Sequence, residues 1–160
     1  MGLSEHGICN GEYKAMKKDT TTYGAVRPKW DKADCSVRAL ACATGVPYEV
    51  ASVTFSAQGR QIRKGTETGV SIHLHEVVLG MKRIEMAEGI RLEAFLEVAK
   101  TGRYIVHKRG HAFAIVEGVV HDWEGTSRNE TTLTRVWKVT ERALGKMAAM
   151  RKLVEELEGL

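Results

Sequence analysis

Three residues of this chain have the types and the order that a thiol-based catalytic site requires. They are Cys35, His111 and Asp122. A cysteine thiolate can attack a carbonyl carbon, a histidine can accept and return the proton, and a carboxylate can orient the histidine. The sequence therefore predicts a catalytic Cys-His-Asp triad made of these three residues.

Cys35 is expected in the first turn of a helix. The stretch from Asp34 to Gly45 is rich in helix-forming residues and ends in a glycine, which suits the position just after a helix. Asp34 is a residue type that caps helix N-termini, and the helix dipole favours an anion in the turn that follows. A thiol there can have its pKa lowered from about 8.5, which makes it a better nucleophile. Cys42, which lies between two alanines, is expected to be a small buried hydrophobe.

The other two residues are brought together by an expected β-hairpin. Two apolar runs, residues 111–116 and 119–123, are separated by a Glu-Gly pair, which predicts a two-residue turn. Because side chains alternate between faces, His111 and Asp122 become diagonal neighbours on one face, with Cα atoms roughly 7–8 Å apart. His121 falls on the opposite face. A turn with an odd number of residues would reverse the choice between the two histidines.

The remaining pattern predicts an α+β fold. Expected helices begin at Pro47 and span residues 71–81 and 90–100, and expected strands span residues 81–86, 103–107, 111–116, 119–123 and 134–139. The helix at 71–81 would be capped by Ser71 and would pack Val77, and the last strand alternates as a half-exposed strand does. Residues 58–69 are expected to be a polar loop, interrupted by glycines, that lines or covers a cleft, and residues 124–132 a polar loop at the surface. An N-terminal helix carrying the cysteine would thus pack across an antiparallel sheet.

The chain is expected to have three parts. Residues 1–27 lack periodicity and predict a flexible N-terminal arm, residues 28–140 form the catalytic core, and residues 141–160 form an amphipathic C-terminal helix. The apolar stripe of that helix consists of Ala143, Met147, Met150, Val154 and Leu157. We expect the stripe to dock on the core; a dimer contact through the same helix is the alternative.

Composition is that of a small enzyme with one domain. The chain has 160 residues and a net charge of +4, which is too small and too dispersed to predict nucleic-acid binding. Two short basic segments, residues 60–64 and 108–109, are interpreted as solvated loops. Three cysteines without paired spacing predict no disulfide framework. The absence of a signal-peptide core and of a membrane-length apolar run favours a cytoplasmic protein that has no membrane association.

A metal site is the competing interpretation of the histidines. His73 and His75 would share a face if their segment were a strand, and His107 lies near His111 across a short turn, so a zinc site is conceivable. The segment around His73 looks at least as helical as extended, and on a helix side chains two apart diverge. We therefore expect no metal and no other cofactor.

The sequence resembles the papain-like cysteine peptidases, in particular the small, often phage-encoded domains related to NlpC-type and bacteriocin-processing peptidases. The resemblance covers roughly residues 30–140. The segments that carry it are Asp34-Cys35, Arg38-Ala39-Leu40, Thr44-Gly45 with Tyr48, Gly102-Arg103-Tyr104-Ile105-Val106, Gly110-His111-Ala112 and Gly118-Val119-Val120-His121-Asp122.

The resemblance implies a nucleophile at Cys35, a base at His111, an orienting acid at Asp122 and, for a phage-encoded protein, a location in the host cytoplasm. Papain itself has a glutamine shortly before its cysteine, whereas both glutamines here follow Cys35. The oxyanion would then be bound by the Cys35 backbone N–H and by a side chain such as Asn10, Tyr23 or Trp30.

The expected activity is that of a cysteine hydrolase of the peptidase or amidase type, acting on a protein or peptide. The same machinery serves proteases, deamidases and transglutaminases, and the sequence does not distinguish them. One alternative is a catalytically weak papain-like fold that acts as a binding or host-modulating protein. Another is a weakly basic nucleic-acid-binding module, whose affinity would fall steeply with salt.

Overall fold

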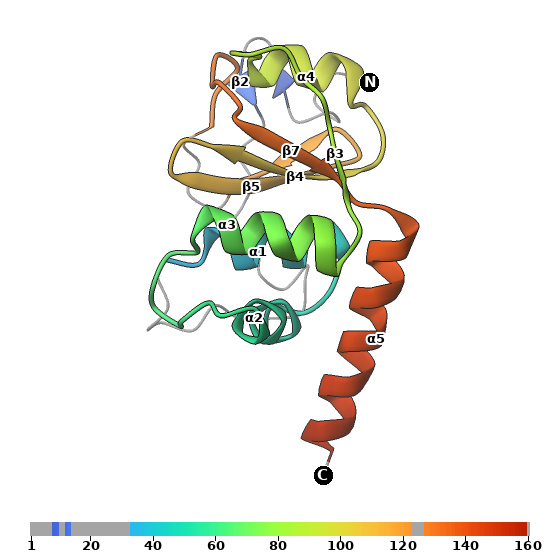
Figure 1. Ribbon diagram of the computed structural model, residues 1–160. Helices are drawn as coiled ribbons and strands as arrows, with labels where there is room; N and C mark the ends of the chain where they lie inside the picture. The colour runs from blue at the N-terminus through green and yellow to red at the C-terminus, as the bar shows by residue number, and fades with distance from the viewer. Residues whose placement is uncertain (1–7, 10–11, 14–32, 123–126, 160) are drawn as a thin grey trace.

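The computed structural model describes residues 8–9, 12–13, 33–122 and 127–159, and its centre is a five-stranded antiparallel sheet with the strand order β3-β7-β4-β5-β6 (Figure 1). Its strands are β3 (Lys82–Arg83), β4 (Arg103–Lys108), β5 (His111–Val116), β6 (Val119–His121) and β7 (Arg135–Lys138). The helices are α1 (Cys35–Thr44), α2 (Tyr48–Ala57), α3 (Thr68–Ile72), the π-helix η3 (His73–Val78), α4 (Leu92–Val98) and α5 (Glu141–Glu158). The fold class is α+β, as the sequence predicts.

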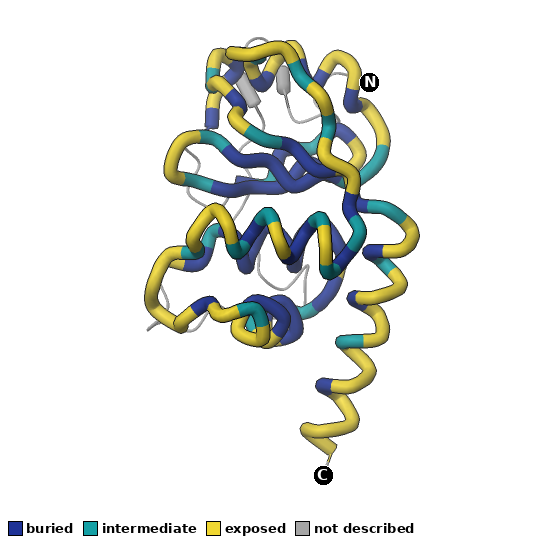
Figure 2. Tube along the Cα trace, in the orientation of Figure 1, coloured by how far each residue is buried: buried dark blue, intermediate teal, exposed yellow. Residues whose placement is uncertain are grey.

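Helices cover both faces of the sheet (Figure 1). α1 packs on one face with α2 behind it, and α4 packs on the other, so that the central strands are buried in Figure 2. Val136 and Trp137 of β7 point to opposite faces and both are fully buried. The expectation of a half-exposed strand at residues 134–139 was therefore wrong, because the alternating pattern does not reveal a helix on the second face.

The β5–β6 hairpin has the predicted two-residue turn. Glu117 and Gly118 both have positive φ angles, 49° and 78°, which is the conformation of a type I′ turn. Val116 pairs with Val119, and Ile115 pairs with Val120. The predicted register is therefore confirmed.

The helix expected at residues 71–81 begins earlier and changes its winding. α3 starts at Thr68, so Ser71 is a buried residue inside the helix and not its cap. From His73 the helix continues as the π-helix η3, in which the N–H of Leu79 donates to the carbonyl of Leu74. The wider turn rotates the side chains relative to an α-helix. His75 is consequently buried, whereas Val77, expected in the core, is 66% exposed.

α4 and β3 are shorter than expected. α4 spans Leu92–Val98 within the expected 90–100, and its buried side chains are those that the apolar spacing predicts: Leu92, Phe95 and Leu96. β3 covers only two residues of the expected strand at 81–86, and it pairs with β7 at the edge of the sheet.

α5 docks on the core along most of its length, from Ala143 to Val154. The Thr140 hydroxyl accepts a hydrogen bond from the N–H of Ala143 and caps the helix. Ala143, Met147 and Val154 are buried, but Leu157 is 60% exposed, and the end of α5 extends beyond α2 in Figure 1. The predicted stripe therefore docks over only part of its length. Among the described helices, none has the length and apolar character needed to cross a membrane.

Most of the expected N-terminal arm, residues 1–27, lies outside the described residues. Within it the structure describes one short antiparallel pair, β1 (Ile8–Cys9) with β2 (Glu12–Tyr13).

Candidate active site

Cys35 is the first residue of α1 and is half-buried, as its position in the sequence predicts. The predicted cap is wrong in one respect. Asp34 occupies the position before the helix, but its carboxylate makes no capping hydrogen bond to the helix backbone. The helix N-terminus still favours a negative charge at Cys35, because the backbone dipoles of α1 point that way.

The Asp34 carboxylate holds the chain next to Cys35 instead of capping α1. It accepts hydrogen bonds from Arg38 Nε, at 3.2 and 3.3 Å to its two oxygens, and from the Tyr48 hydroxyl at 2.9 Å. All three of these side chains are buried. Both carboxylate oxygens are thus engaged by side chains, and these bonds take the place of a cap to the helix backbone. The contacts fix the N-terminus of α1 against α2.

His111 and Asp122 form a direct hydrogen-bonded pair. The Nε2 atom of His111 lies 2.7 Å from Oδ1 of Asp122, and the Asp122 side chain is completely buried. The second oxygen of Asp122 accepts hydrogen bonds from the backbone N–H of Ser127 at 2.9 Å and from its hydroxyl at 2.5 Å. Both carboxylate oxygens are thus held in fixed directions, which in turn fixes the plane of the imidazole.

A hydrogen bond also joins His111 to the side chain of Cys35. Since Nε2 faces Asp122, Nδ1 is the ring nitrogen that remains for the sulfur. Burial alone would lower the pKa of His111, but the hydrogen bonds with Asp122 and Cys35, and the negative charges of both, raise it to about 9. For Asp122 the effect of burial is the opposite, since burial alone would raise its pKa. The hydrogen bonds from His111 and Ser127 nevertheless hold the pKa of Asp122 well below its usual range. At neutral pH the arrangement favours an imidazolium between two anions.

Two features of β5 make the meeting of helix and strand possible. Ala112 and Ala114 face α1, and their small side chains allow the helix to approach the strand closely. His111 shares the other face with Phe113, against which its ring stacks with centroids 6.3 Å apart. Because His111 is the first residue of β5, it lies at the end of the sheet and reaches the N-terminus of α1 from there.

His121 lies away from this site. It pairs with Ala114 across the hairpin and so faces the α1 side of the sheet. Burial and the nearby charge of Arg103 lower the pKa of His121 to about 4. Arg103 itself donates a hydrogen bond to the carbonyl of Ala43, near the C-terminal end of α1. The structure therefore brings His111 and Asp122 to Cys35 and leaves His121 near the other end of the helix.

The side chains considered for the oxyanion, Asn10, Tyr23 and Trp30, lie outside the described residues. The Cys35 backbone N–H is the donor that the described part of the chain offers at the nucleophile.

Two of the histidines considered for zinc, His75 and His107, pack in the hydrophobic core. His75 and His107 contact Trp137 in the core, with ring centroids 4.9 and 4.7 Å from the indole. Burial, together with the charge of His107, lowers the pKa of His75 to about 3, and burial with the charges of Arg135 and His111 lowers that of His107 to about 4. Within the described residues, no group of three or more His, Cys, Asp or Glu side chains is placed to hold a metal ion.

Ser127 is the residue of this site that the sequence does not identify. Residues 124–132 were expected to run over the surface, but Ser127 and Asn129 are buried, which corrects that expectation for this part of the loop. The loop turns inward because the buried carboxylate of Asp122 needs donors in addition to His111. The only signal in the sequence is a serine five residues after the aspartate, and that spacing is common in any polar loop.

The assignment of this site depends on the contacts among Cys35, His111, Asp122 and Ser127. Cys35 comes from α1, His111 from β5, and Asp122 and Ser127 from the connection between β6 and β7, so no short motif contains the whole site. Comparisons of the chain with protein-family models, with curated proteins and with solved structures give no match.

Proposed function

We propose that this protein is a cysteine hydrolase of the peptidase or amidase type, with the papain-like arrangement that the sequence resembles. The observation that carries the proposal is the continuous series of contacts from Cys35 through His111 to Asp122, in which His111 has a raised pKa of about 9. A protonated imidazole beside a cysteine at a helix N-terminus stabilises the thiolate, which is the reactive form of the side chain.

In the first half of the reaction, the Cys35 thiolate attacks the carbonyl carbon of an amide and forms a bond between sulfur and carbon. The carbonyl oxygen becomes an oxyanion, to which the Cys35 backbone N–H donates a hydrogen bond. The tetrahedral intermediate collapses when the carbon–nitrogen bond breaks and His111 gives its proton to the departing amine. The result is a thioester between Cys35 and the acyl group, with His111 now neutral.

In the second half, neutral His111 removes a proton from water, and the resulting hydroxide attacks the thioester carbon. The carbon–sulfur bond breaks, which releases a carboxylic acid and restores the thiolate and the imidazolium. Asp122 remains ionised throughout. It orients the ring through Nε2 and stabilises the positive charge that His111 carries in the resting state.

The proposal is tested by comparing the wild-type protein with Cys35→Ala in a peptide-library cleavage assay and in a search of a proteome digest for new termini and deamidated sites. We expect products with the wild type and at least about 10³-fold fewer with Cys35→Ala, because the step that forms the thioester is lost. Cys42→Ala is the matched control, since Cys42 is buried in the middle of the same helix, and it is expected to retain activity. Equal product patterns for wild type and Cys35→Ala, with binding of the same proteins by both, would contradict the hydrolase and favour the binding protein.

A further inference from the structure

A polar hollow lies in the loop between α2 and α3. Its volume is about 230 Å³, and Arg60, Lys64 and Glu67 are its charged lining residues. Gly59 and Gly65 also line it and have open space where a side chain would begin. Lys64 is an exposed basic residue of this lining, and the size of the hollow suits one side chain of a bound peptide.

This hollow lies next to the nucleophile. Arg60 is buried, and one of its terminal nitrogens donates a hydrogen bond of 3.0 Å to the carbonyl of Ala33, two residues before Cys35. Standard backbone dimensions then place that nitrogen within about 10 Å of the Cα atom of Cys35. An extended substrate bound at Cys35 spans that distance with about three residues.

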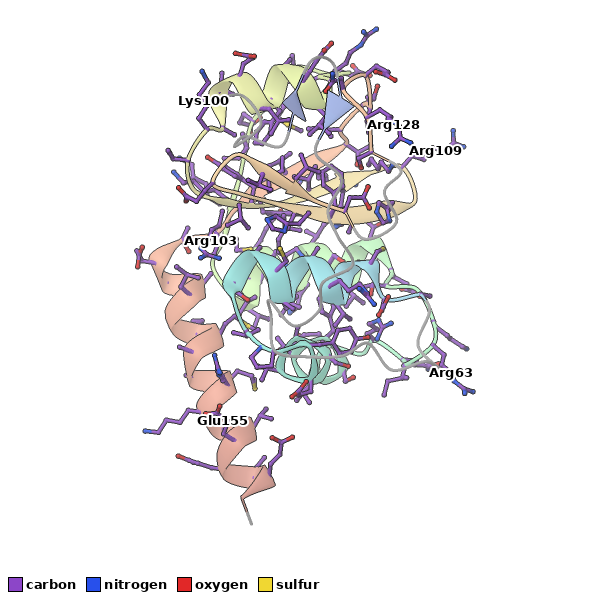
Figure 3. All side chains as sticks on the ribbon, turned by 180° about the vertical axis from the view of Figure 1, so that it is seen from behind. Arg63, Lys100, Arg103, Arg109, Arg128 and Glu155 are labelled. Atoms are coloured by element: carbon purple, nitrogen blue, oxygen red, sulfur yellow. The ribbon has the colours of Figure 1, made fainter. Side chains whose placement is uncertain are left out.

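Three further arginines lie on one side of the molecule. Figure 3 shows Arg63, Arg109 and Arg128 on one side, and Lys100 and Arg103 on the opposite side. Arg109 lies in the β4–β5 turn that precedes His111, and Arg128 follows Ser127, whose hydroxyl binds Asp122. Arg109 and Arg128 lie close together in Figure 3, and Arg63 lies on the same side at the level of α2. Residues 60–64 and 108–109 were expected to be solvated loops; this was wrong for Arg60, which is buried because it binds the carbonyl of Ala33.

We propose that the hollow is the specificity site of the enzyme and that it takes a carboxylate of the substrate, as in an acidic peptide, through Lys64. The inference rests on the proposed function because it assigns the substrate class of the same site. Lys64 is exposed at the hollow and supplies a point charge, while Arg60 links the hollow to the chain before Cys35. The arginines on the same side, Arg63, Arg109 and Arg128, attract an anionic peptide over a longer range.

Two alkylating reagents of nearly equal size test the inference: bromoacetyl-glutamate amide and bromoacetyl-glutamine amide, which differ by one negative charge. The Cys35 sulfur displaces bromide from each reagent and forms a thioether bond to its CH₂ carbon. Peptide mapping of the full chain quantifies the thioether. We expect the glutamate reagent to label wild-type Cys35 at least about three times faster at low salt, and we expect Lys64→Gln to lower this ratio by about half. Lys64→Glu lowers it further. Lys100→Gln, an exposed lysine on the opposite side, leaves it unchanged.

The outcomes separate the two proposals. Rapid labelling of Cys35 by both reagents at equal rates, or a ratio that Lys64→Gln and Lys64→Glu do not change, would overturn the specificity site and leave the hydrolase standing. Slow labelling of Cys35 by both reagents, at the rate of an ordinary thiol, would contradict the hydrolase itself. A preference for the glutamate reagent that falls with Lys64→Gln and disappears in 0.5 M salt supports the inference.

Discussion

Replacing His111 by alanine is expected to slow the alkylation of Cys35 by iodoacetamide at pH 5.5 by at least about tenfold. Without the imidazolium, Cys35 becomes a thiol with a pKa near 8.5, of which only about 0.1% is thiolate at that pH. A thiolate of higher pKa is intrinsically more nucleophilic, which offsets part of the loss and explains why the expected effect is not a thousandfold. The rate is measured by brief labelling and peptide mapping.

His121→Ala is the matched control for this experiment. His121 lies on the same hairpin and also has a perturbed pKa, but it faces the α1 side of the sheet and lies near Arg103. We expect its replacement to change the rate of Cys35 alkylation less than twofold. If His121→Ala slows the alkylation of Cys35 and His111→Ala leaves it at the wild-type rate, the wrong histidine has been assigned as the base.

Replacing His75 by leucine is expected to stabilise the protein, and most strongly in acid. His75 is fully buried, and neither of its ring nitrogens has a hydrogen-bond partner among the described residues. Leucine has a similar volume and no polar atoms. The free energy of unfolding of His75→Leu at pH 7 should therefore be about 1–2 kcal/mol higher than that of the wild type. Thermal or urea unfolding of both proteins between pH 7 and pH 4.5 measures the difference.

The pH dependence follows from the direction of the shift. The pKa of His75 is about 3 in the folded protein and about 6.5 in the unfolded chain, so the unfolded chain binds a proton that the folded protein does not as the pH falls below 6.5. Between pH 7 and pH 5, the free energy of unfolding of the wild type should therefore fall by about 2 kcal/mol more than that of His75→Leu. His107 acts in the same direction and remains in the variant.

His73→Leu is the control for this series, because His73 is exposed on the same helix. We expect its unfolding free energy to keep the wild-type dependence on pH. If His75→Leu loses stability in acid as steeply as the wild type and His73→Leu do, His75 is not held neutral in the core.

The parts of the fold that short-range rules decide were predictable from the sequence. The Glu117-Gly118 turn fixes the register of β5 and β6, and the register alone places His111 and Asp122 on one face. The position of Cys35 at the start of α1 also follows from local pattern. These are the features on which the candidate site depends.

The predictions that were wrong concern residues whose contacts are made with distant parts of the sequence. Asp34 was expected to cap α1, but Tyr48, fourteen residues away, binds its carboxylate together with Arg38. The burial of Ser127 depends on Asp122, and the burial of both faces of β7 depends on helices on either side of the sheet. No local pattern carries such information.

The central claim, that Cys35 is a thiolate paired with the His111 imidazolium, is tested most directly by the pH dependence of Cys35 alkylation in the wild-type protein. Labelling with iodoacetamide is followed at Cys35 and at Cys42, which is buried and serves as the slow internal reference. We predict that the rate at Cys35 changes less than about threefold between pH 5.5 and pH 7.5, because the thiolate is already formed at the lower pH. A rise of about a hundredfold over that interval, as for a thiol with a pKa near 8.5, would contradict the account.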